Sequence, residues 1–338
     1  MSMKRSFALM TLLSILALGC GGGGDNTAPK KDQKAAPAPQ GKKAAENTPA
    51  KGEMKGEIKA DGSSTVLLIS QAIASEYSKT NPNVKISVGR SGTGGGFKKF
   101  AAGETDISNA SRPIKAEEKE SCAKNGVEFF EFQVAWDGLS IVINKENTWA
   151  KNMTVAQLKT MWDKDSKVEN WSDVDPTWPK EKVKLFGAGT DSGTFDFFTE
   201  VINGKSGQSR TSYQPTEDDN VTVNGVAKDK FALGYFGLAY YEENKEKLGI
   251  VSVAKKEGEK FVSPSEATVM DKTYSPLSRP LFIYVKKSSL KRPEVQDFMT
   301  FFLRRNDLIA QAKYIKMDAL MQSDVQEKLA NAIKEAGK

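Results

Sequence analysis

Three times along this chain, a short strand pattern runs into a loop of glycine and hydroxyl residues and then into a helical pattern. The strand patterns are residues 58–60, 84–88 and 183–186, and the loops are residues 61–65, 90–96 and 187–194. Apolar residues recur at helical spacing after the loops, as in residues 66–77 after the first one. Strands that alternate with helices in this way predict an α/β fold.

These loops are suited to hold an oxyanion. The first turn of a helix leaves backbone N–H groups without partners, and the aligned peptide dipoles add partial positive charge there. Glycines let the backbone approach a ligand closely, and hydroxyls supply uncharged donors. In any one loop the hydroxyl residue can instead be a simple N-cap, but three such loops in one chain favour an anion site. The GxxxxGK[ST] nucleotide loop is absent.

The absence of histidine excludes several classes of function. It removes histidine-based catalytic triads, the commonest general base and most zinc sites. Only two cysteines are present, Cys20 and Cys122, so a four-ligand structural zinc site is also excluded, and we expect no metal, cofactor or catalytic residue. The 338 residues suit two domains. The net charge of +6 fits an anionic ligand or membrane surface, but the scattered lysines do not predict nucleic-acid binding.

The N-terminus has the pattern of an export signal. Lys4 and Arg5 precede an apolar stretch, residues 7–18, that is shorter than the about 20 residues of a spanning helix. Residues 16–20 read LALGC and resemble a bacterial lipobox, although Ala17 stands where that motif usually has leucine. We therefore expect a signal peptide over residues 1–19 and a lipid on Cys20; an ordinary signal peptide with an incidental cysteine is the alternative.

A tether is expected to follow. Residues 20–56 are rich in glycine, alanine, proline and lysine and nearly free of large apolar side chains, so they cannot bury enough surface to offset their ordering entropy. Further along, residues 217–220 read EDDN, which does not fit the spacing of a calcium loop, so we interpret them as a solvated loop.

Several sequence blocks resemble the phosphate-binding proteins of bacterial phosphate ABC importers. They keep that family's order and spread over residues 57–338: DGSSTV, SGTGGGFKKFAAGETDISNASRPI, VAWDGLSIVIN, GTDSGTF, ALGYFGLAY and YSPLSRPLFIYV. The resemblance implies an α/β, two-domain periplasmic-binding-protein-like (type II) fold with two interdomain crossovers and the ligand in the cleft. The crossovers are expected near Asp137-Gly138 and Arg279-Pro280. Domain I would be residues 57–137 plus 281–338, and domain II residues 138–280.

The resemblance also implies a binding site and a role. The protein would capture inorganic phosphate for an ABC permease and ATPase, without catalysis, as a monomer that is exported and lipid-anchored to a membrane facing the periplasm or cell exterior. Donors to the ligand would come from both domains: Ser64, Thr65, Val66, Thr93, Ser192, Gly193 and Thr194. Another tetrahedral oxyanion (sulfate, molybdate or arsenate) or a surface or sensing role without transport remains an alternative.

Two positions depart from the family's pattern. Arg112 stands where well-known members have an aspartate that accepts the ligand's proton, and Ala188 stands where they have an arginine. We hypothesise that Arg112 supplies the charge contact to the oxyanion; an interdomain salt bridge is the alternative. The proton acceptor would then lie elsewhere. Asp137 and Asp191 are candidates, although the first can serve the hinge and the second can cap a helix.

Overall fold

The computed structural model describes residues 54–338. The predicted signal peptide (residues 1–19), the lipidation site Cys20 and most of the predicted tether (residues 20–56) lie outside the described residues. Met54 is already buried, and the hydroxyl of Tyr77 lies 3.7 Å from its sulfur. The first strand, β1, begins at Gly56. Within residues 54–338, no helix is both long enough and apolar enough to cross a bilayer.

One continuous set of strands runs through the described part of the chain, in the order β2-β1-β3-β11-β4-β8-β6-β7. Strands β1, β2 and β3 are parallel, β11 and β4 run antiparallel to their neighbours, and β6 is parallel to β7 and β8. The strands on this path are β1 (Gly56–Gly62), β2 (Val84–Val88), β3 (Ile107–Ala110), β4 (Phe129–Asn144), β6 (Lys184–Ala188), β7 (Gln214–Thr216), β8 (Ala232–Gly237) and β11 (Ser278–Lys286).

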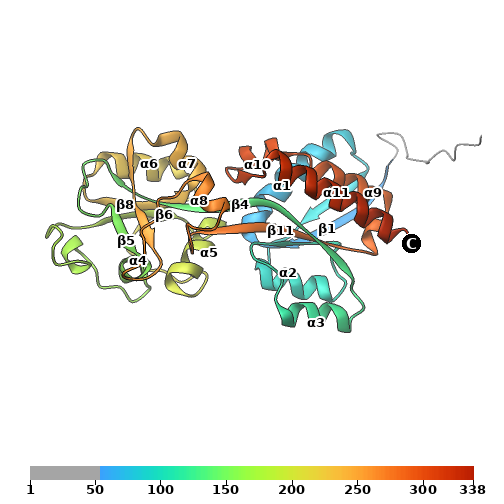
Figure 1. Cartoon of the computed structure of the whole chain (residues 1–338), viewed down its shortest axis with the longest axis horizontal. Helices are drawn as coiled ribbons and strands as arrows, with labels where there is room; N and C mark the ends of the chain where they lie inside the picture. The colour runs from blue at the N-terminus through green and yellow to red at the C-terminus, as the bar shows by residue number, and fades with distance from the viewer. Residues whose placement is uncertain (1–53) are drawn as a thin grey trace, which may run out of the picture. The chain divides into compact units, whose positions relative to one another are not determined.

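The two largest of the four hydrophobic clusters within residues 54–338 define two lobes. We call the part built around Ile58, Phe132, Leu281 and their neighbours the first lobe, and the part built around Leu139, Trp162, Leu233 and their neighbours the second lobe. Strands β4 and β11 pass from one lobe to the other, as Figure 1 shows. The domain boundaries expected after Asp137 and Pro280 fall inside these two strands. We propose that the first and second lobes are domain I and domain II with those boundaries.

Helices cover the strands in both lobes (Figure 1). The first lobe holds α1 (Ser64–Thr80), α2 (Gly92–Ala101), α3 (Ala116–Lys124), α9 (Pro293–Phe302), α10 (Asn306–Gln311) and α11 (Ala319–Ala336). The second lobe holds α4 (Val155–Trp162), α5 (Gly193–Phe198), α6 (Asp219–Lys228), α7 (Leu238–Asn244) and α8 (Glu266–Met270), with a π-helical turn over Thr199–Asn203. Short strands complete the structure: β5 (Asn152–Thr154), β9 (Leu248–Ile250), β10 (Ser252–Ala254) and β12 (Ile315–Lys316), the last paired with β4.

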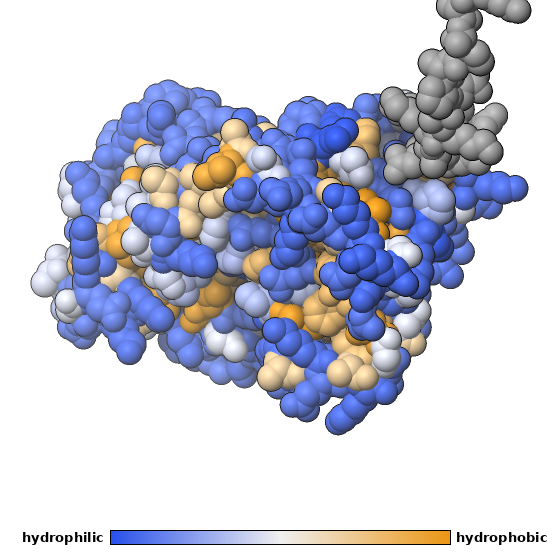
Figure 2. Space-filling model, turned by 45° about the vertical axis from the view of Figure 1, so that its right-hand side comes forward, coloured by the Kyte–Doolittle hydropathy of each residue, from blue (hydrophilic) through white to orange (hydrophobic). Residues whose placement is uncertain are grey.

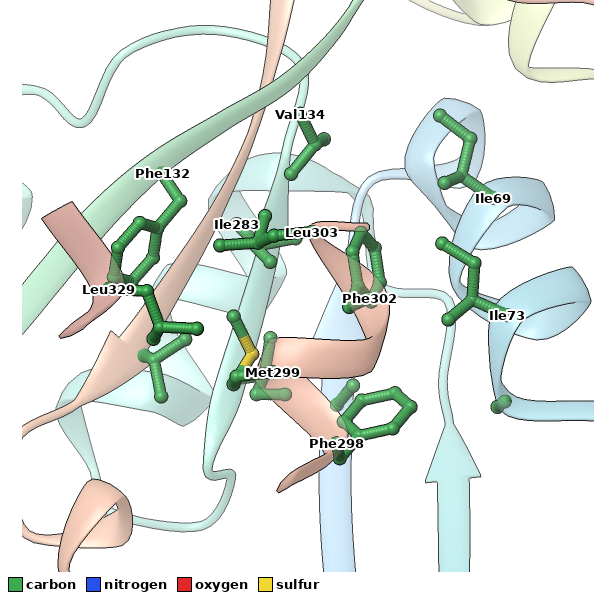
Figure 3. Packing of buried hydrophobic residues seen from close by; sticks show 14 of the residues in the cluster. Ile69, Ile73, Phe132, Val134, Ile283, Phe298, Met299, Phe302, Leu303 and Leu329 are labelled. Carbon is green, nitrogen blue, oxygen red and sulfur yellow. The ribbon is translucent and has the colours of Figure 1, made fainter. Parts of the chain in front are cut away.

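The core of the first lobe fixes helix α1 beside the strands. Its apolar residues Val66, Ile69, Ile73 and Tyr77 are all fully buried, which confirms the helical face predicted from their spacing. In Figure 3, Ile69 and Ile73 point toward the side of α9 that carries Phe302. Burial of each such side chain contributes about 1.5–3 kcal/mol. The start of α1 is thereby held at the end of β1.

Helix α2 begins earlier than the sequence indicated. Glycine disfavours helix interiors, so the helix was expected only after residue 96, yet α2 starts at Gly92, whose φ is +72°. Close packing between α2 and β1 explains the glycine at position 96. A Cβ on Gly96 would lie 2.5 Å from the Cα of Gly62, so only glycine allows the helix to approach the strand this closely.

The surface is largely polar. Figure 2 shows a mostly hydrophilic face on which hydrophobic residues form small separate patches. The large hydrophobic side chains that are exposed in the described part of the chain are Leu68, Val221, Phe261 and Leu320. Single exposed apolar residues of this kind are normal for a soluble domain.

Candidate functional site

A cavity of about 260 Å³ opens where the two lobes meet. The first lobe contributes the loop before α1, the start of α2 and the loop after β3, while the second lobe contributes the stretch that follows the start of α5. Arg279 of β11 completes the wall. The polar lining residues are Ser63, Ser64, Thr65, Thr93, Ser111, Arg112, Lys115, Asp196, Glu200, Ser206 and Arg279.

The start of α1 provides hydroxyls at this cavity. Ser63 caps the helix, because its Oγ accepts a hydrogen bond from the N–H of Val66 at 3.5 Å. Ser64 Oγ donates to Asp196 Oδ2 at 2.6 Å, and Thr65 Oγ1 donates to the carbonyl oxygen of Gly193 at 3.3 Å. Both contacts join the first lobe to the second. The start of α1 therefore lies at the contact between the lobes.

Arg279 is the cation most deeply placed at the cavity. Its Nη2 donates to Thr65 Oγ1 at 2.7 Å and lies 3.1 Å from Asp137 Oδ2. Asp137 and Arg279 are register partners on β4 and β11, so the ion pair lies on the two crossover strands. The guanidinium carbon lies 3.6 Å from the ring centroid of Phe197. The aromatic face and the carboxylate together hold this guanidinium in one orientation.

Burial and the ion pair act in opposite directions on Asp137. Its side chain is almost fully enclosed, and this desolvation raises the pKa of the carboxyl, while Arg279 lowers it. A buried charge pair of this kind is costly to break, because the remaining partner would be left without compensation. The pair therefore stabilises the present geometry of the crossover strands.

Thr93 and Arg112 form the wall contributed by α2 and the loop after β3. Thr93 Oγ1 lies 3.0 Å from Ser111 Oγ and accepts a hydrogen bond from the N–H of Ser111 at 3.2 Å. Arg112 lines the cavity, but its guanidinium donates two hydrogen bonds to Glu118, each 2.8 Å long. Burial would raise the pKa of Glu118, but hydrogen bonds from Arg112 and from the Lys115 N–H outweigh it and lower the pKa. Arg112 thus has its carboxylate partner within its own lobe.

The third loop lies against a second cavity of about 340 Å³, which shares Ser64 with the first. Ser192 caps the short helix α5 by accepting the N–H of Thr194 at 3.1 Å. The N–H of Asp191 donates to Glu217 Oε1 at 3.3 Å.

One expectation about residues 217–220 was wrong. Asp219 was expected in a solvated loop, but it is partly buried at the start of α6 and lines the second cavity. The reason is that α6 packs on β8 and β6.

The residues predicted from the sequence are therefore divided between two neighbouring cavities. Four of them line the first cavity: Ser64, Thr65, Thr93 and Arg112. Ser64 also lines the second, together with Asp137, Asp191, Ser192, Gly193 and Thr194. Val66 lines neither, and Ser63 occupies its N–H. The two groups meet where Thr65 touches Gly193.

Sequence reasoning missed several polar residues of the first cavity, among them Arg279, Asp196 and Glu200. Arg279 was identified only as a crossover residue, and the carboxylates of Asp196 and Glu200 were not considered. One signal was available for Arg279: it is the only charged residue in the otherwise apolar or hydroxyl-bearing block YSPLSRPLFIYV, and a charge in a buried strand requires a partner. For Asp196 and Glu200 we find no signal beyond their position after the third loop.

The chemistry of the first cavity suits binding of a small anion. It combines arginines and hydroxyl donors with two carboxylates, which can accept a proton carried by the ligand. Within residues 54–338, no group of histidine, cysteine or acidic side chains is arranged to hold a metal ion.

Comparisons with known proteins agree with this architecture. A profile described as "PBP superfamily domain" matches residues 40–306. A solved structure from Planctomyces limnophilus, described as "a possible phosphate binding protein", superposes with a TM-score of 0.81 at 50% identity, covering 83% of this chain and 99% of that one. The predicted two-domain periplasmic-binding-protein fold is confirmed.

Two curated proteins are similar over most of their length. Protein SphX of Synechococcus elongatus is 46% identical over 249 residues, which are 73% of this chain and 73% of that protein. The phosphate-binding protein PstS of Staphylococcus saprophyticus is 40% identical over 284 residues, which are 83% of this chain and 87% of that protein.

Proposed function

This chain belongs to the PBP superfamily and, within it, to the family of Protein SphX and the phosphate-binding protein PstS, and from this premise we propose that it captures inorganic phosphate for an ABC importer. We propose the role of a substrate-binding protein, with no reaction of its own. The expected partners are a permease and an ATPase.

One observation carries this proposal: the buried guanidinium of Arg279 lies at an interlobe cavity beside the hydroxyl of Thr65. A water takes up roughly 30 Å³ in the liquid, so a cavity of about 260 Å³ holds a tetrahedral anion together with several waters. We propose Arg279 as the principal charge contact. Arg112 would be a weaker second contact, because its side chain is 28% exposed whereas that of Arg279 is 11% exposed, and a more exposed charge contact is better screened by water.

The carboxylates at the same cavity support selection of a protonated oxyanion. Phosphate carries a proton at neutral pH, whereas sulfate does not. We propose that Asp196 or Glu200 accepts this proton, since both line the cavity that contains Thr65 and Thr93. Asp137 and Asp191 remain weaker candidates because they line the second cavity. A carboxylate oxygen that faces a sulfate oxygen would place two hydrogen-bond acceptors against each other with no proton between them. Such a mismatch lowers the affinity for sulfate strongly relative to phosphate.

Calorimetric titration of the ligand-free protein tests the proposal. Phosphate should bind one to one, and sulfate at least ~100-fold more weakly. Arg279→Ala should weaken phosphate binding by about 100-fold, equivalent to about 3 kcal/mol, because a charge-assisted contact in an enclosed site is lost. Arg305→Ala, at an arginine paired with Asp307 away from the cavity, is the control and should bind normally.

Arg279→Ala also leaves Asp137 without its partner, so thermal unfolding is measured in parallel. Arg279→Lys keeps the charge but loses the forked contact with Thr65 and Asp137, and it should bind phosphate with intermediate affinity. Equal binding of sulfate, or full phosphate affinity in a folded Arg279→Ala protein, would refute the assignment.

We further propose that the protein is exported, is anchored through a lipid on Cys20 outside the cytoplasm and acts as a monomer. The sequence pattern before Cys20 supports the anchor.

A further inference from the structure

The second interlobe cavity has an excess of acidic side chains. Four carboxylates line it: Asp137, Asp191, Glu217 and Asp219. The residues come from both lobes and from crossover strand β4, and the first lobe also contributes Lys313 and Tyr314. This cavity shares Ser64 with the one that holds Thr93 and Arg279, but none of its four carboxylates lines that first cavity.

Positive charge from the protein compensates these carboxylates only in part. Arg279 pairs with Oδ2 of Asp137, but Oδ1 of Asp137 accepts no hydrogen bond from any described residue. Arg90 lies 3.7 Å from Asp191, whose side chain is 87% exposed, so that pair is weak. Lys313 pairs with Glu243 instead.

Asp219 has no cationic partner among the described residues. Burial, together with the neighbouring carboxylates of Asp218 and Glu217, raises the pKa of Asp219 to about 7. The charged form of this carboxyl is therefore unfavourable in its protein surroundings. A bound cation would reverse this effect.

Tyr314 supplies an independent observation. Its side chain is only 8% exposed and lines the cavity, yet its hydroxyl has no hydrogen-bond partner within residues 54–338. Asp137, 5% exposed, also lines this cavity, and Arg279 engages only its Oδ2. The Tyr314 hydroxyl and Asp137 Oδ1 are therefore both free to accept a hydrogen bond from a ligand in this cavity. The ring of Tyr240 already carries one cation, with Lys313 Nζ 5.3 Å from its centroid.

We propose that this second cavity binds a small organic cation with a primary ammonium group. An ammonium has three donors and no acceptor, which matches the acceptors Asp137 Oδ1, the Asp219 carboxylate and the Tyr314 hydroxyl. The tyrosine rings and Leu67 suit the alkyl part of such a ligand. A metal ion is a poorer match, because the described residues contain no group arranged as metal ligands. This inference does not depend on the phosphate proposal.

The test is a calorimetric titration with 1,4-diaminobutane at pH 8, in a buffer free of other amines. The diamine should bind, and 1,4-butanediol, which has the same chain without charge, should not. Asp219→Asn should weaken diamine binding at least tenfold. Asp218→Asn removes the same charge from the adjacent residue, which does not line the cavity and can still cap α6 as asparagine. It should weaken diamine binding far less than Asp219→Asn does, because the Asp219 carboxylate remains.

A second pair of variants guards against effects on folding. Tyr314→Phe should weaken diamine binding several-fold, while Tyr274→Phe removes an unpaired buried hydroxyl elsewhere and should have no effect. Failure of the diamine to bind, equal binding of the diol, or unchanged affinity in both Asp219→Asn and Tyr314→Phe would overturn the inference. Mg²⁺ that displaces the diamine at equal concentration would also overturn it. A parallel phosphate titration shows separately whether the phosphate proposal holds.

Discussion

At the scale of single residues, the two interlobe cavities differ in how their charges are balanced. Around the first, Arg112 is paired with Glu118 and Arg279 with Asp137. Around the second, Asp219 has no cationic partner within the described chain. An unbalanced carboxylate affects stability as well as binding, because its ionisation then opposes folding.

The pH dependence of stability should report this imbalance. The pKa of Asp219 is raised from 3.8 to about 7 in the folded protein. The folded state therefore holds a proton that the unfolded state releases between pH 4 and 7, so this group's contribution to stability is full below pH 4 and is lost as the pH rises through 7. Asp219→Asn removes the titration, and it should be more stable than the wild type by about 2–4 kcal/mol at pH 8 and nearly equal to it at pH 4.

Urea unfolding at pH 4, 6 and 8, in buffer without amines, measures this difference. Asp218→Asn is the comparison: it removes one of the charges that raise the pKa of Asp219 but leaves that carboxyl in place, so it should reduce the pH dependence only in part. If the free energy of unfolding changed with pH equally in Asp219→Asn and the wild type, Asp219 would not be the source of the pH dependence.

At the scale of elements, the starts of helices α1 and α5 determine how closely the lobes approach. A Cβ on Gly193, the first residue of α5, would lie 2.7 Å from the Cα and N of Thr65. Real Cβ atoms do not approach other atoms this closely, so the contact requires glycine at this position. Any side chain there would separate the two helices.

Gly193→Ala should therefore impair binding more than folding. The added methyl group would push α5 away from Thr65, and we expect phosphate affinity to fall about tenfold or more, since a small misplacement of binding groups is costly. Gly237→Ala is the matched control in the same lobe, because its Cβ would make an ordinary 3.8 Å contact with the Lys313 carbonyl oxygen. Calorimetry measures both affinities. Unaltered phosphate binding by Gly193→Ala would show that the phosphate-bound protein does not need the close contact between Gly193 and Thr65.

Much of the element pattern could be predicted from the sequence. The strand patterns at residues 84–88 and 183–186 correspond to β2 and β6, and the helical spacing after residue 65 corresponds to α1. These predictions depend on local periodicity, which short windows reveal. The early start of α2 could not be predicted from local periodicity, because Gly96 is required by a contact with Gly62 of a different element.

The site itself was less predictable, for a physical reason. Arg279 and Asp137 are 142 residues apart in sequence, and their pairing follows from the register of two crossover strands. Family resemblance placed Thr65 and Thr93 at the first cavity. It did not indicate that Glu118 would engage Arg112, because such a contact depends on side-chain geometry rather than on motif order.

At the scale of the whole described structure, exposed ion pairs join the lobes as well. Arg90 of the first lobe lies 3.7 Å from Asp191 and 3.8 Å from Asp196 of the second. Lys313 pairs with Glu243 across the same division. Each such pair contributes little to the free energy of the contact between the lobes, and salt screens it. All of these pairs are nevertheless lost when the lobes separate.

Arg90→Gln should thus weaken phosphate binding only two- to fivefold at low ionic strength, equivalent to about 0.5–1 kcal/mol. The difference should vanish in about 0.5 M NaCl, since the screening length is then only a few ångströms. Lys79→Gln removes an exposed pair within α1 and is the control. Titrations at two salt concentrations measure the effect, and a loss that persists at high salt would show that Arg90 contacts the ligand directly.

The position of Arg279 and Asp137 on the crossover strands also bears on the kinetics of capture. If the lobes close by rotating about the crossover strands, atoms near that axis move least, and this guanidinium would be in place before the lobes meet. An incoming anion would then encounter a charge that is already oriented, and the contacts between the lobes would form afterwards. The association rate would then be governed chiefly by the crossover, and the dissociation rate by the contacts that the lobes make with each other.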